Sequence, residues 1–352
     1  MQIQTLAHPF ILGLILSMSS NLMAQTTPLA ELKKSPSVTL TNGQVTAKIY
    51  LPDEDQGFYR GARFDWAGMI GSLTYADHDF YPPWFEAMSP EVRDFENEDG
   101  FVTASPQTAA TGPVDEFNAE GGALGYAEAS PGSTFVKIGV GVLRKLDDSR
   151  YRFTESYPLV DGGERINLVR GNQVEFLHRV QDTESGYGYE YIKTLRLEPN
   201  QPVLVIEHAL LNTGSKQIDT EVYNHNFLNI DDSGSSANLV LSVPYSLDST
   251  ELPDPALATV DEHTLTYLGK PPAGESVRLN LSGFGDRAED YDFRTYHQDL
   301  GAGVRITSDQ PMSQAVLWSV APVMAVEPFI AMSIAPGESH SWSYRYEFEA
   351  KQ

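Results

Sequence analysis

The sequence of 352 residues contains no cysteine. This absence excludes disulfide bonds, catalytic thiolates, cysteine-ligated zinc and a lipid-anchored N-terminal cysteine. Stability therefore has to come from a packed core, and the hydrophobic content of 41% is enough to build a large one.

Basic residues are also scarce: 24 Lys and Arg stand against 48 Asp and Glu, giving a formal net charge of −24. Nucleic acids and anionic membrane surfaces both select basic patches, so we expect neither as a partner. The glycine-rich stretch Glu116–Gly125 does not follow a strand in the manner of a phosphate-binding turn. We therefore predict no nucleotide and no other cofactor.

Long apolar runs are missing too. The run Phe10–Met18 is too short to span a membrane, and no later segment reaches the ~20 apolar residues that a spanning helix needs. The first 24 residues carry no Lys, Arg, Asp or Glu and end at Leu22-Met23-Ala24, which indicates a secretory signal peptide cleaved after Ala24. We expect a soluble periplasmic or secreted protein with no membrane contact after cleavage, organised as signal peptide 1–24, polar leader 25–37 and one domain 38–352.

Convincing amphipathic helices of ten or more residues are absent, and most of the chain follows strand patterns instead. Residues 38–49 alternate around Asn42-Gly43, a strong hairpin signal. Further strands are expected at 135–143, 151–153, 165–169, 174–180, 187–197 and 203–211, with turn residues between them. This spacing predicts an all-β chain folded as one large antiparallel β-sandwich.

Residues 76–120 show little periodicity and many acidic, proline and aromatic residues. An irregular stretch of this length inside a compact domain is usually functional or mobile. Asp77, His78 and Asp79 have the composition of a metal site, but no third partner stands at a set spacing. We predict no metal site here, and metal binding by these residues stays an open alternative.

The most informative stretch is 203–232. It begins as a strand, reverses at Asn212-Thr213-Gly214-Ser215, and returns as a second strand that ends in Tyr223-Asn224-His225-Asn226-Phe227. Alternation puts Tyr223, His225 and Phe227 on one face and the two asparagines on the other. A histidine among aromatic residues suits acid–base chemistry on a sugar, and the alternative is a core histidine satisfied by hydrogen bonds.

A second polar and aromatic stretch runs from Gly57 to Gly68 and contains Arg60, Arg63, Asp65 and Trp66. Planar charged groups mixed with aromatic rings suit stacking on a sugar and hydrogen bonding to its hydroxyls. The alternative is an Arg–Asp pair that braces a loop.

An isolated acid, Glu327, interrupts the apolar run Val323–Val326 and is followed at once by Pro328. A carboxylate in such surroundings loses water, which raises its pKa and makes it a better base near neutral pH. The alternative is an acid at a strand end that faces water.

The order of these motifs resembles the aldose 1-epimerase (galactose mutarotase-like) superfamily, particularly its hexose-6-phosphate epimerase branch. The shared order is Asn-Thr-Gly, strand, His, aromatic residue and Asp, followed ~100 residues later by Val-Glu-Pro, strand and Pro-Gly-Glu. The entropy cost of closing so long a loop between the two motifs is small enough for them to meet. The resemblance implies that His225 is the acid, Glu327 the base, and Asp231 a group that meets substrate hydroxyls.

The resemblance also implies a mechanism without a cofactor on a mono- or oligosaccharide substrate. Glu327 removes the O1 proton while His225 protonates O5, so that the ring opens and recloses with the anomeric centre inverted. We expect the two groups on opposite sides of the C1–O5 unit. Trp66, Phe227 and Trp318 are candidates for the stacking surface, although a core position is favoured for Trp318.

Two other sugar-related functions stay open. A polysaccharide lyase on uronate-containing glycans has suitable side chains in Arg60, Arg63, Tyr189, Tyr223, Asn224 and His225, and a basic cleft floor on this acidic protein would favour it. A non-catalytic carbohydrate-binding protein is the third interpretation, favoured by a wide separation of His225 and Glu327.

Overall fold

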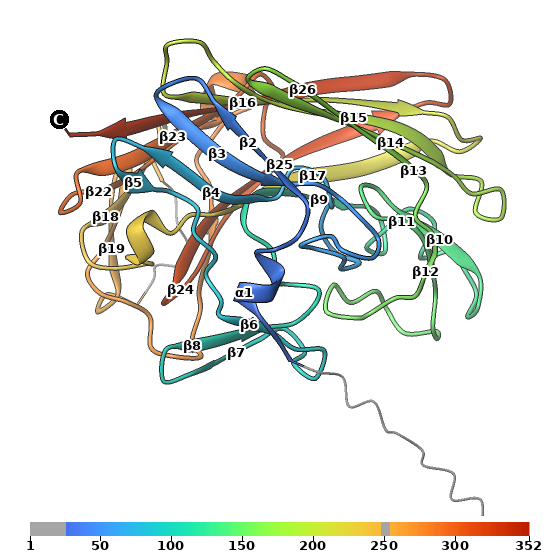
Figure 1. The fold of residues 1–352 in the computed structure, drawn as a ribbon, viewed down its shortest axis with the longest axis horizontal. Helices are drawn as coiled ribbons and strands as arrows, with labels where there is room; N and C mark the ends of the chain where they lie inside the picture. The colour runs from blue at the N-terminus through green and yellow to red at the C-terminus, as the bar shows by residue number, and fades with distance from the viewer. Residues whose placement is uncertain (1–25, 248–253, 352) are drawn as a thin grey trace, which may run out of the picture.

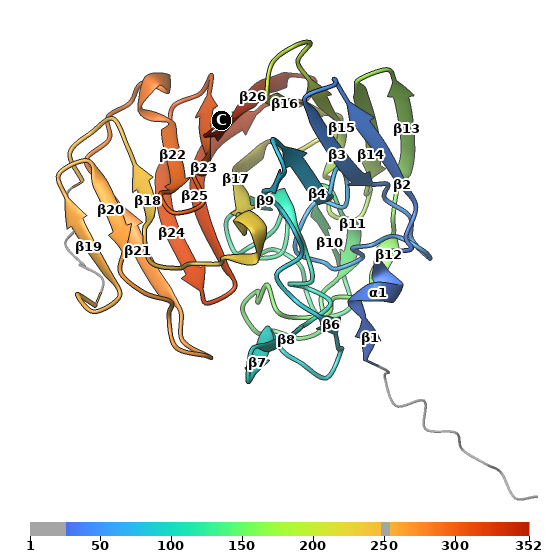
Figure 2. The same cartoon turned by 60° about the vertical axis from the view of Figure 1, so that its left-hand side comes forward.

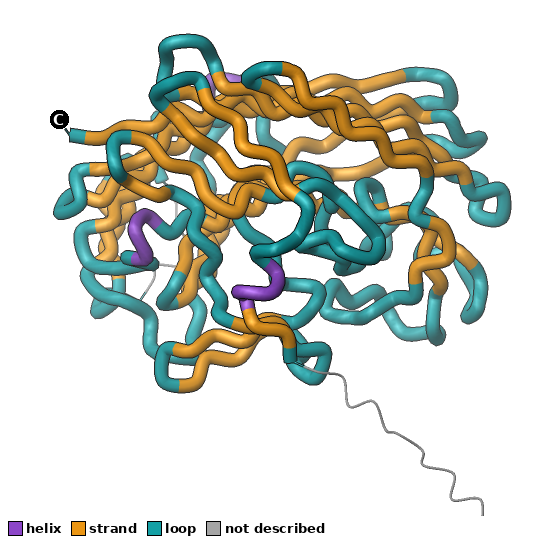
Figure 3. The backbone as a smooth tube through the Cα atoms, viewed as in Figure 1, coloured by secondary structure: helices purple, strands orange, loops and turns teal. Residues whose placement is uncertain are grey.

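The computed structural model describes residues 26–247 and 254–351, so the predicted signal peptide lies outside the described residues. Strands dominate these ranges, as Figure 3 shows, and their one α-helix, α1 (Leu29–Leu32), has four residues. Two 3-10 segments, η1 (Ile230–Asp232) and η2 (Ala288–Asp290), complete the helical content of these ranges. The predicted all-β class is confirmed, and no helix in these ranges is long and apolar enough to cross a membrane.

The largest sheet has ten antiparallel strands and curves along the top and down one side of the molecule in Figure 1. In spatial order its strands are β13 (Glu164–Arg170), β14 (Gln173–Gln181), β15 (Gly188–Leu197), β16 (Val203–Asn212), β26 (Ser339–Ala350), β23 (Ala302–Ser308), β22 (Asp292–His297), β18 (Leu239–Ser242), β20 (Thr264–Tyr267) and β19 (Ala258–Asp261). Strands β14, β15 and β26 alternate buried and partly exposed residues, the pattern of a sheet with one face on a core.

A five-stranded antiparallel sheet packs against the concave side of the large one, as the turned view in Figure 2 shows. Its order is β21 (Val277–Leu281), β24 (Gln314–Val320), β25 (Val323–Ile334), β17 (Ile218–Phe227) and β9 (Gly112–Asn118). Apolar residues of both sheets belong to one continuous core. The predicted sandwich is confirmed, with this smaller sheet as its second layer.

Three small sheets surround this sandwich. They are β2 (Ser37–Thr41), β3 (Val45–Tyr50), β4 (Ile70–Tyr75) with β5 (His78–Asp79); β10 (Thr134–Lys137), β11 (Gly141–Arg144) with β12 (Leu159–Asp161); and β1 (Thr27–Pro28), β6 (Ala87–Met88), β8 (Phe101–Ala104) with β7 (Phe95–Glu98). The hairpin predicted at Asn42-Gly43 joins β2 to β3. In the segment predicted as a polar leader, β1 pairs with β6 and Leu32 is buried.

Some strand predictions differ from the structure. The run 135–143 is not one strand but the hairpin β10–β11, because Gly139 adopts a left-handed φ of 82° and reverses the chain. Residues 151–153 form no strand and belong to the connection between β11 and β12. The reversal at 212–215 also joins no hairpin: β16 pairs with β15 and β26, whereas β17 pairs with β25 and β9. The turn carries the chain from one layer of the sandwich to the other.

A buried ionic group lies between the two layers. The Nζ atom of Lys193 on β15 lies 2.7 Å from Asp115 on β9 and 3.2 Å from Asp65, and all three side chains are at most 1% exposed. Burial lowers the pKa of Lys193, but the two carboxylates outweigh it and raise that pKa above its usual value. The lysine is therefore charged at any physiological pH and is the counter-charge shared by two buried acids. Its charge helps to lower the pKa of Asp115 in spite of burial, whereas burial keeps the pKa of Asp65 raised.

We expect Lys193→Met to destabilise the protein by about 3–5 kcal/mol, because it leaves two buried carboxylates without a counter-charge. Chemical denaturation followed by circular dichroism measures the loss. Lys216→Met is the matched control, since its ion pair with Glu128 is exposed and should contribute at most about 1 kcal/mol. Equal losses in the two variants would contradict the importance of the buried group.

Candidate active site

One cavity of about 820 Å³ has the outer face of the five-stranded sheet as its floor. Paired residues on neighbouring antiparallel strands point to the same side, so the register identifies this face. It pairs Arg278 with Trp318, Phe329 with Tyr223, and Tyr223 with Glu116. All five side chains line the cavity.

Strand β17 divides its polar residues between the two faces as the alternation predicted. Tyr223, His225 and Phe227 line the cavity. Asn224 points the other way: its side chain bonds to Asp115 at 3.1 Å and accepts a bond from Tyr346 at 2.9 Å, and it is fully buried. The structure therefore does not bring Asn224, predicted as a substrate-binding residue, to the cavity: its side chain lies between the sheets.

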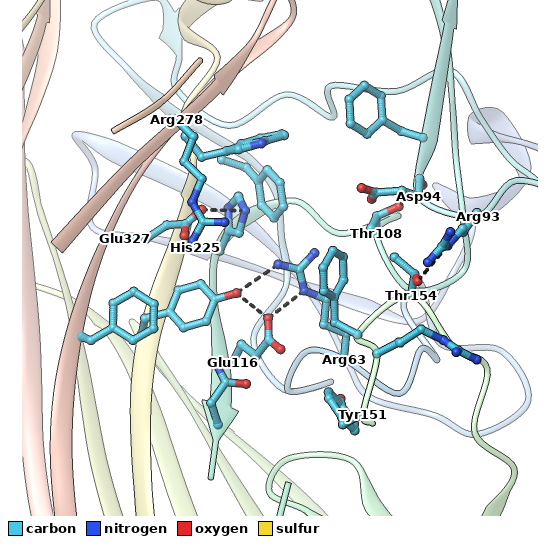
Figure 4. Close-up of a pocket in the computed structure, with 18 of the residues that line it drawn as sticks. Arg63, Arg93, Asp94, Thr108, Glu116, Tyr151, Thr154, His225, Arg278 and Glu327 are labelled. Atoms are coloured by element: carbon cyan, nitrogen blue, oxygen red, sulfur yellow. Dashed lines mark hydrogen bonds and ion pairs between the residues drawn. The ribbon is translucent and has the colours of Figure 1, made fainter. Parts of the chain in front are cut away.

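His225 and Glu327 are in direct contact on the cavity floor, although 102 positions separate them in the sequence. The Nε2 atom of His225 lies 3.1 Å from Oε1 of Glu327, the contact drawn in Figure 4. Antiparallel pairing of β17 with β25 brings them together, since Tyr223 pairs with Phe329 and a further bridge joins Leu228 to Met324. The two side chains emerge side by side from one face, so they do not flank the space that a sugar ring would occupy.

Burial in an aromatic surround sets the protonation of this pair. The His225 ring stacks on Phe227 at 3.8 Å and meets Trp318 and Phe64 edge to face. Burial lowers the pKa of His225 well below its usual value, and the nearby charge of Arg63 lowers it further. Burial also raises the pKa of Glu327 to about 7. Each group thus favours its neutral form, and Nδ1 of His225 is buried without a hydrogen-bond partner.

Arg63 holds a second polar group beside this pair, as Figure 4 shows. Its Nε donates to Glu116 at 2.6 Å and its Nη2 to the Tyr223 hydroxyl at 3.0 Å, while Tyr223 itself donates to Glu116. Burial raises the pKa of Glu116, but the charges of Arg63 and Lys137 outweigh it and the pKa is lowered. This carboxylate stays ionised and neutralises Arg63. The guanidinium carbon also lies 4.3 Å from the ring centroid of Phe64 and 4.2 Å from that of Phe153.

The cavity lining is basic although the chain is acidic. It contains five arginines and three acids, namely Arg63, Arg93, Arg150, Arg152, Arg278, Asp94, Glu116 and Glu327. Aromatic rings complete the walls, among them Trp84, Phe95 and Trp318. For Trp318 the sequence had favoured a core position. Planar cations beside apolar rings suit a ligand with both ring faces and negative or hydroxyl groups.

Several other predicted site residues lie elsewhere. Asp65 belongs to the buried ionic group with Lys193, so its carboxylate has no access to a ligand. Arg60 and Trp66 line a separate cavity of about 460 Å³, where the indole nitrogen of Trp66 donates to the Gly61 carbonyl. Asp231 accepts from the Asp79 backbone and lies 2.6 Å from Nδ1 of His78. Of the four predicted residues in 57–68, Arg63 alone lines the large cavity.

No group of three or more His, Asp or Glu in the described ranges is arranged to hold a metal ion. His78, which the sequence offered as a metal ligand, contacts Asp231 instead. Its neighbour Asp79 accepts backbone bonds from Leu73 and Tyr81 and so braces the β4–β5 turn.

Sequence reasoning missed several residues of the cavity. Glu116 follows Asp115 and so lacks the isolated position in an apolar run that identified Glu327, and it lies in a stretch interpreted as a loop. Arg278 and Arg93 are exposed polar residues next to apolar neighbours, a pattern shared with any strand or turn at the surface. No local signal distinguishes these two arginines, because the fold alone brings them to the cavity.

Comparison with known proteins gave matches in structure only. No family model matches the sequence, and no curated protein matches it. A candidate aldose 1-epimerase from Escherichia coli K12 superposes over 90% of this chain and 99% of its own, with a TM-score of 0.52 at 13% identity. A galactose mutarotase-like protein from Lactobacillus casei covers 89% and 100% (TM-score 0.51, 14% identity), and a galactose mutarotase related enzyme from Lactobacillus acidophilus covers 90% and 100% (TM-score 0.52, 11% identity).

The chain has the galactose mutarotase-like fold. The resemblance found in the sequence is thereby confirmed at the level of the fold. Because identities of 11–14% show the fold alone, the roles of His225 and Glu327 depend on the geometry of the cavity rather than on these relatives.

The raised pKa of Glu327 gives a direct test of the pair. We expect its carboxyl group to titrate near pH 7 in NMR spectra of protein labelled with ¹³C at glutamate side chains, with Glu327→Gln to assign the signal. Arg278→Gln should move the midpoint higher, since the Arg278 charge lowers this pKa. Arg170→Gln, an exposed arginine outside the cavity, should leave it in place. A midpoint near the usual 4.5 would contradict the buried geometry.

Proposed function

We propose that this protein is an exported aldose 1-epimerase-like isomerase that interconverts the anomers of a sugar by general acid–base catalysis. The observation that carries the proposal is the contact of 3.1 Å between His225 and Glu327 on the floor of an aromatic cavity. A galactose mutarotase-like fold and several relatives named for this chemistry support it. No cofactor takes part in the proposed reaction.

The side-by-side geometry suits the reacting atoms. Both oxygens that exchange protons, O1 and O5, are bonded to the same carbon, so an adjacent acid and base can reach them from one edge of the sugar. In the forward step Glu327 accepts the O1 proton and His225 donates a proton to O5. The C1–O5 bond breaks, C1 becomes an aldehyde carbonyl, and rotation about C1–C2 lets O5 attack the other face.

The proton balance of the pair favours this chemistry. Ring opening removes one proton from O1 and delivers one to O5. The pair starts as protonated His225 with ionised Glu327 and ends as neutral His225 with protonated Glu327, so it holds one proton before and after. Transfer between Nε2 and Oε1 across 3.1 Å then restores the starting state. Burial disfavours the charged forms of His225 and Glu327. A step that keeps the total charge of the pair constant therefore avoids the cost of an isolated buried ion.

The first experiment measures mutarotation by polarimetry or NMR on the mature protein with a panel of neutral hexoses, pentoses and uronic acids. His225→Ala and Glu327→Gln should each lower kcat/KM about 10²–10⁴-fold, the usual contribution of one positioned acid or base. His263→Ala is the matched control, because this half-exposed histidine lies outside the cavity and should not change the rate. Equal rates in all four proteins would overturn the proposal.

The pH profile gives an independent test. The reacting pair must hold one shared proton, because His225 needs a proton to donate to O5 while Glu327 is ionised. The pKa of His225 is lowered well below its usual value and that of Glu327 is raised to about 7, so the shared proton is lost as the pH rises through about 7. We therefore expect kcat/KM to fall as the pH rises through about 7, because the pair then has a base but no acid. A rate that increases as the pH rises through about 7 would contradict a proton shared by His225 and Glu327.

A second candidate function is a polysaccharide lyase for uronate-containing glycans, which the five arginines of the cavity favour. In this reaction an arginine neutralises the uronate, a base such as His225 removes the C5 proton, and the C4–O bond breaks as a C4–C5 double bond forms. Tyr189, Asn224 and Arg60 take no part, because they lie outside the cavity. Unsaturated product without anomeric exchange would assign the protein to this class, and neither activity with sugar binding retained would leave a carbohydrate-binding protein.

A further inference from the structure

The arginines of the cavity differ in whether a carboxylate neutralises them. Arg63 is paired with Glu116 at 2.6 Å and Arg152 with Glu155 at 2.6 Å. Arg93, Arg150 and Arg278 have no carboxylate within 4 Å in the described part of the chain. This is notable in a protein whose acids outnumber its bases 48 to 24.

These three arginines occupy two regions of the cavity. Arg278 lies next to His225 and Glu327, with its guanidinium directed toward them in Figure 4. Arg93 lies on the far side of Arg63 in the same view, where its Nε bonds to the Thr154 hydroxyl at 3.4 Å.

Arg150 belongs to the same connection as Thr154, between β11 and β12, whereas Arg93 precedes β7. Both connections line the cavity. We call the cavity side formed by Arg93 and Arg150 the loop wall.

The loop wall has the composition of an anion site. Both arginines are exposed to the cavity, and each offers several N–H groups that no described residue uses. Asp94 is the acid closest in sequence and lines the same cavity, but it makes no ion pair with Arg93 within 4 Å. Burial raises the pKa of Asp94, and the charges of Arg63 and Arg93 offset only part of this rise. A carboxylate, sulfate or phosphate matches the planar guanidinium better than a neutral hydroxyl does, since it accepts two charge-assisted bonds.

We propose that the loop wall is an anion-binding subsite and that the cavity selects an acidic saccharide, with its anionic group held by Arg93 and Arg150. The inference rests on the proposed function in that it assumes a saccharide in the cavity. The volume of about 820 Å³ lies near the upper end of the roughly 300–1,000 Å³ typical of small-ligand sites, which leaves room for more than one sugar residue.

Arg278 is the weaker choice for the anion because of its neighbours. An anion bound there would lie against Glu327, whose ionised form the Arg278 charge supports. Two negative charges sharing one arginine repel each other, and each weakens the other's contact. At the loop wall the anion is separated from Glu327 by the neutralised Arg63, so the reacting carbon can reach the pair while the anion stays apart.

The test is isothermal titration calorimetry on the mature protein with a trisaccharide of galacturonic acid and with its methyl ester, which is neutral and nearly the same shape. We expect the acid to bind at least about tenfold more tightly than the ester, the effect of one charge-assisted contact. Galactose 6-sulfate and galactose 6-phosphate, each compared with galactose, show whether sulfate or phosphate replaces the carboxylate.

The variants separate the loop wall from general electrostatics. Arg93→Gln and Arg150→Gln should each reduce the preference for the acid, and the double variant should abolish it. Arg170→Gln removes the same charge from an exposed arginine outside the cavity and should keep the full preference. Arg278→Gln should also keep it, while shifting the pH profile of catalysis through Glu327.

The inference would be overturned if the acid and the ester bound equally well, or if the preference for the acid survived in the double variant. It would also be overturned if no carboxylate, sulfate or phosphate probe bound. The proposed function fails separately. An acid preference that depends on Arg93 and Arg150, in a protein that does not accelerate mutarotation, supports the subsite and rejects the epimerase. Mutarotation of neutral sugars without a preference for the acid would support the epimerase and reject the subsite.

Discussion

The position of β17 between β9 and β25 is the constraint on which both the core and the cavity depend. Its side chains alternate, so His225 faces the cavity and contacts Glu327, while Asn224 faces the large sheet and bonds to Asp115 and Tyr346. A slip of one residue would exchange these two sets and place buried amides in the cavity. The buried polar bonds between the layers therefore fix the register that brings the acid and base together.

The sequence predicted the fold class, the alternation of β17 and the presence of a partly desolvated acid at Glu327, because each is a local pattern with a local cause. It did not predict which sheet each strand joins. The residues around Gly214 specify a reversal, but the partner of β17 is set by packing between layers that lie far apart in sequence. The pairing of His225 with Glu327 likewise came from a family resemblance, since spacing alone cannot reveal a contact across 102 positions.

Two of the predicted site residues that lie outside the cavity, Asp65 and Asn224, share one physical reason. Asp65 and Asn224 are polar residues in apolar surroundings, which is what a catalytic group requires, but this sandwich also uses such residues to connect its layers. A polar side chain in a strand has the same sequence signature whether it bonds to a ligand or to Lys193. Only the three-dimensional structure distinguishes them, by showing that one face of β9 and β17 borders a cavity and the other a closed core.

The molecule repels anions at long range through its net negative charge, but the lining of its cavity is rich in arginine. The net charge of −24 repels polyanions at a distance, which disfavours nucleic acids and non-specific association with acidic polymers. This repulsion is screened beyond the Debye length of about 10 Å at 0.1 M salt, whereas contacts inside the cavity are screened much less. An acidic saccharide that reaches the cavity therefore meets the arginines without most of the opposing field. Such an arrangement gives selectivity by fit to the loop wall rather than by overall charge, and it works best in a compartment whose salt content is not low.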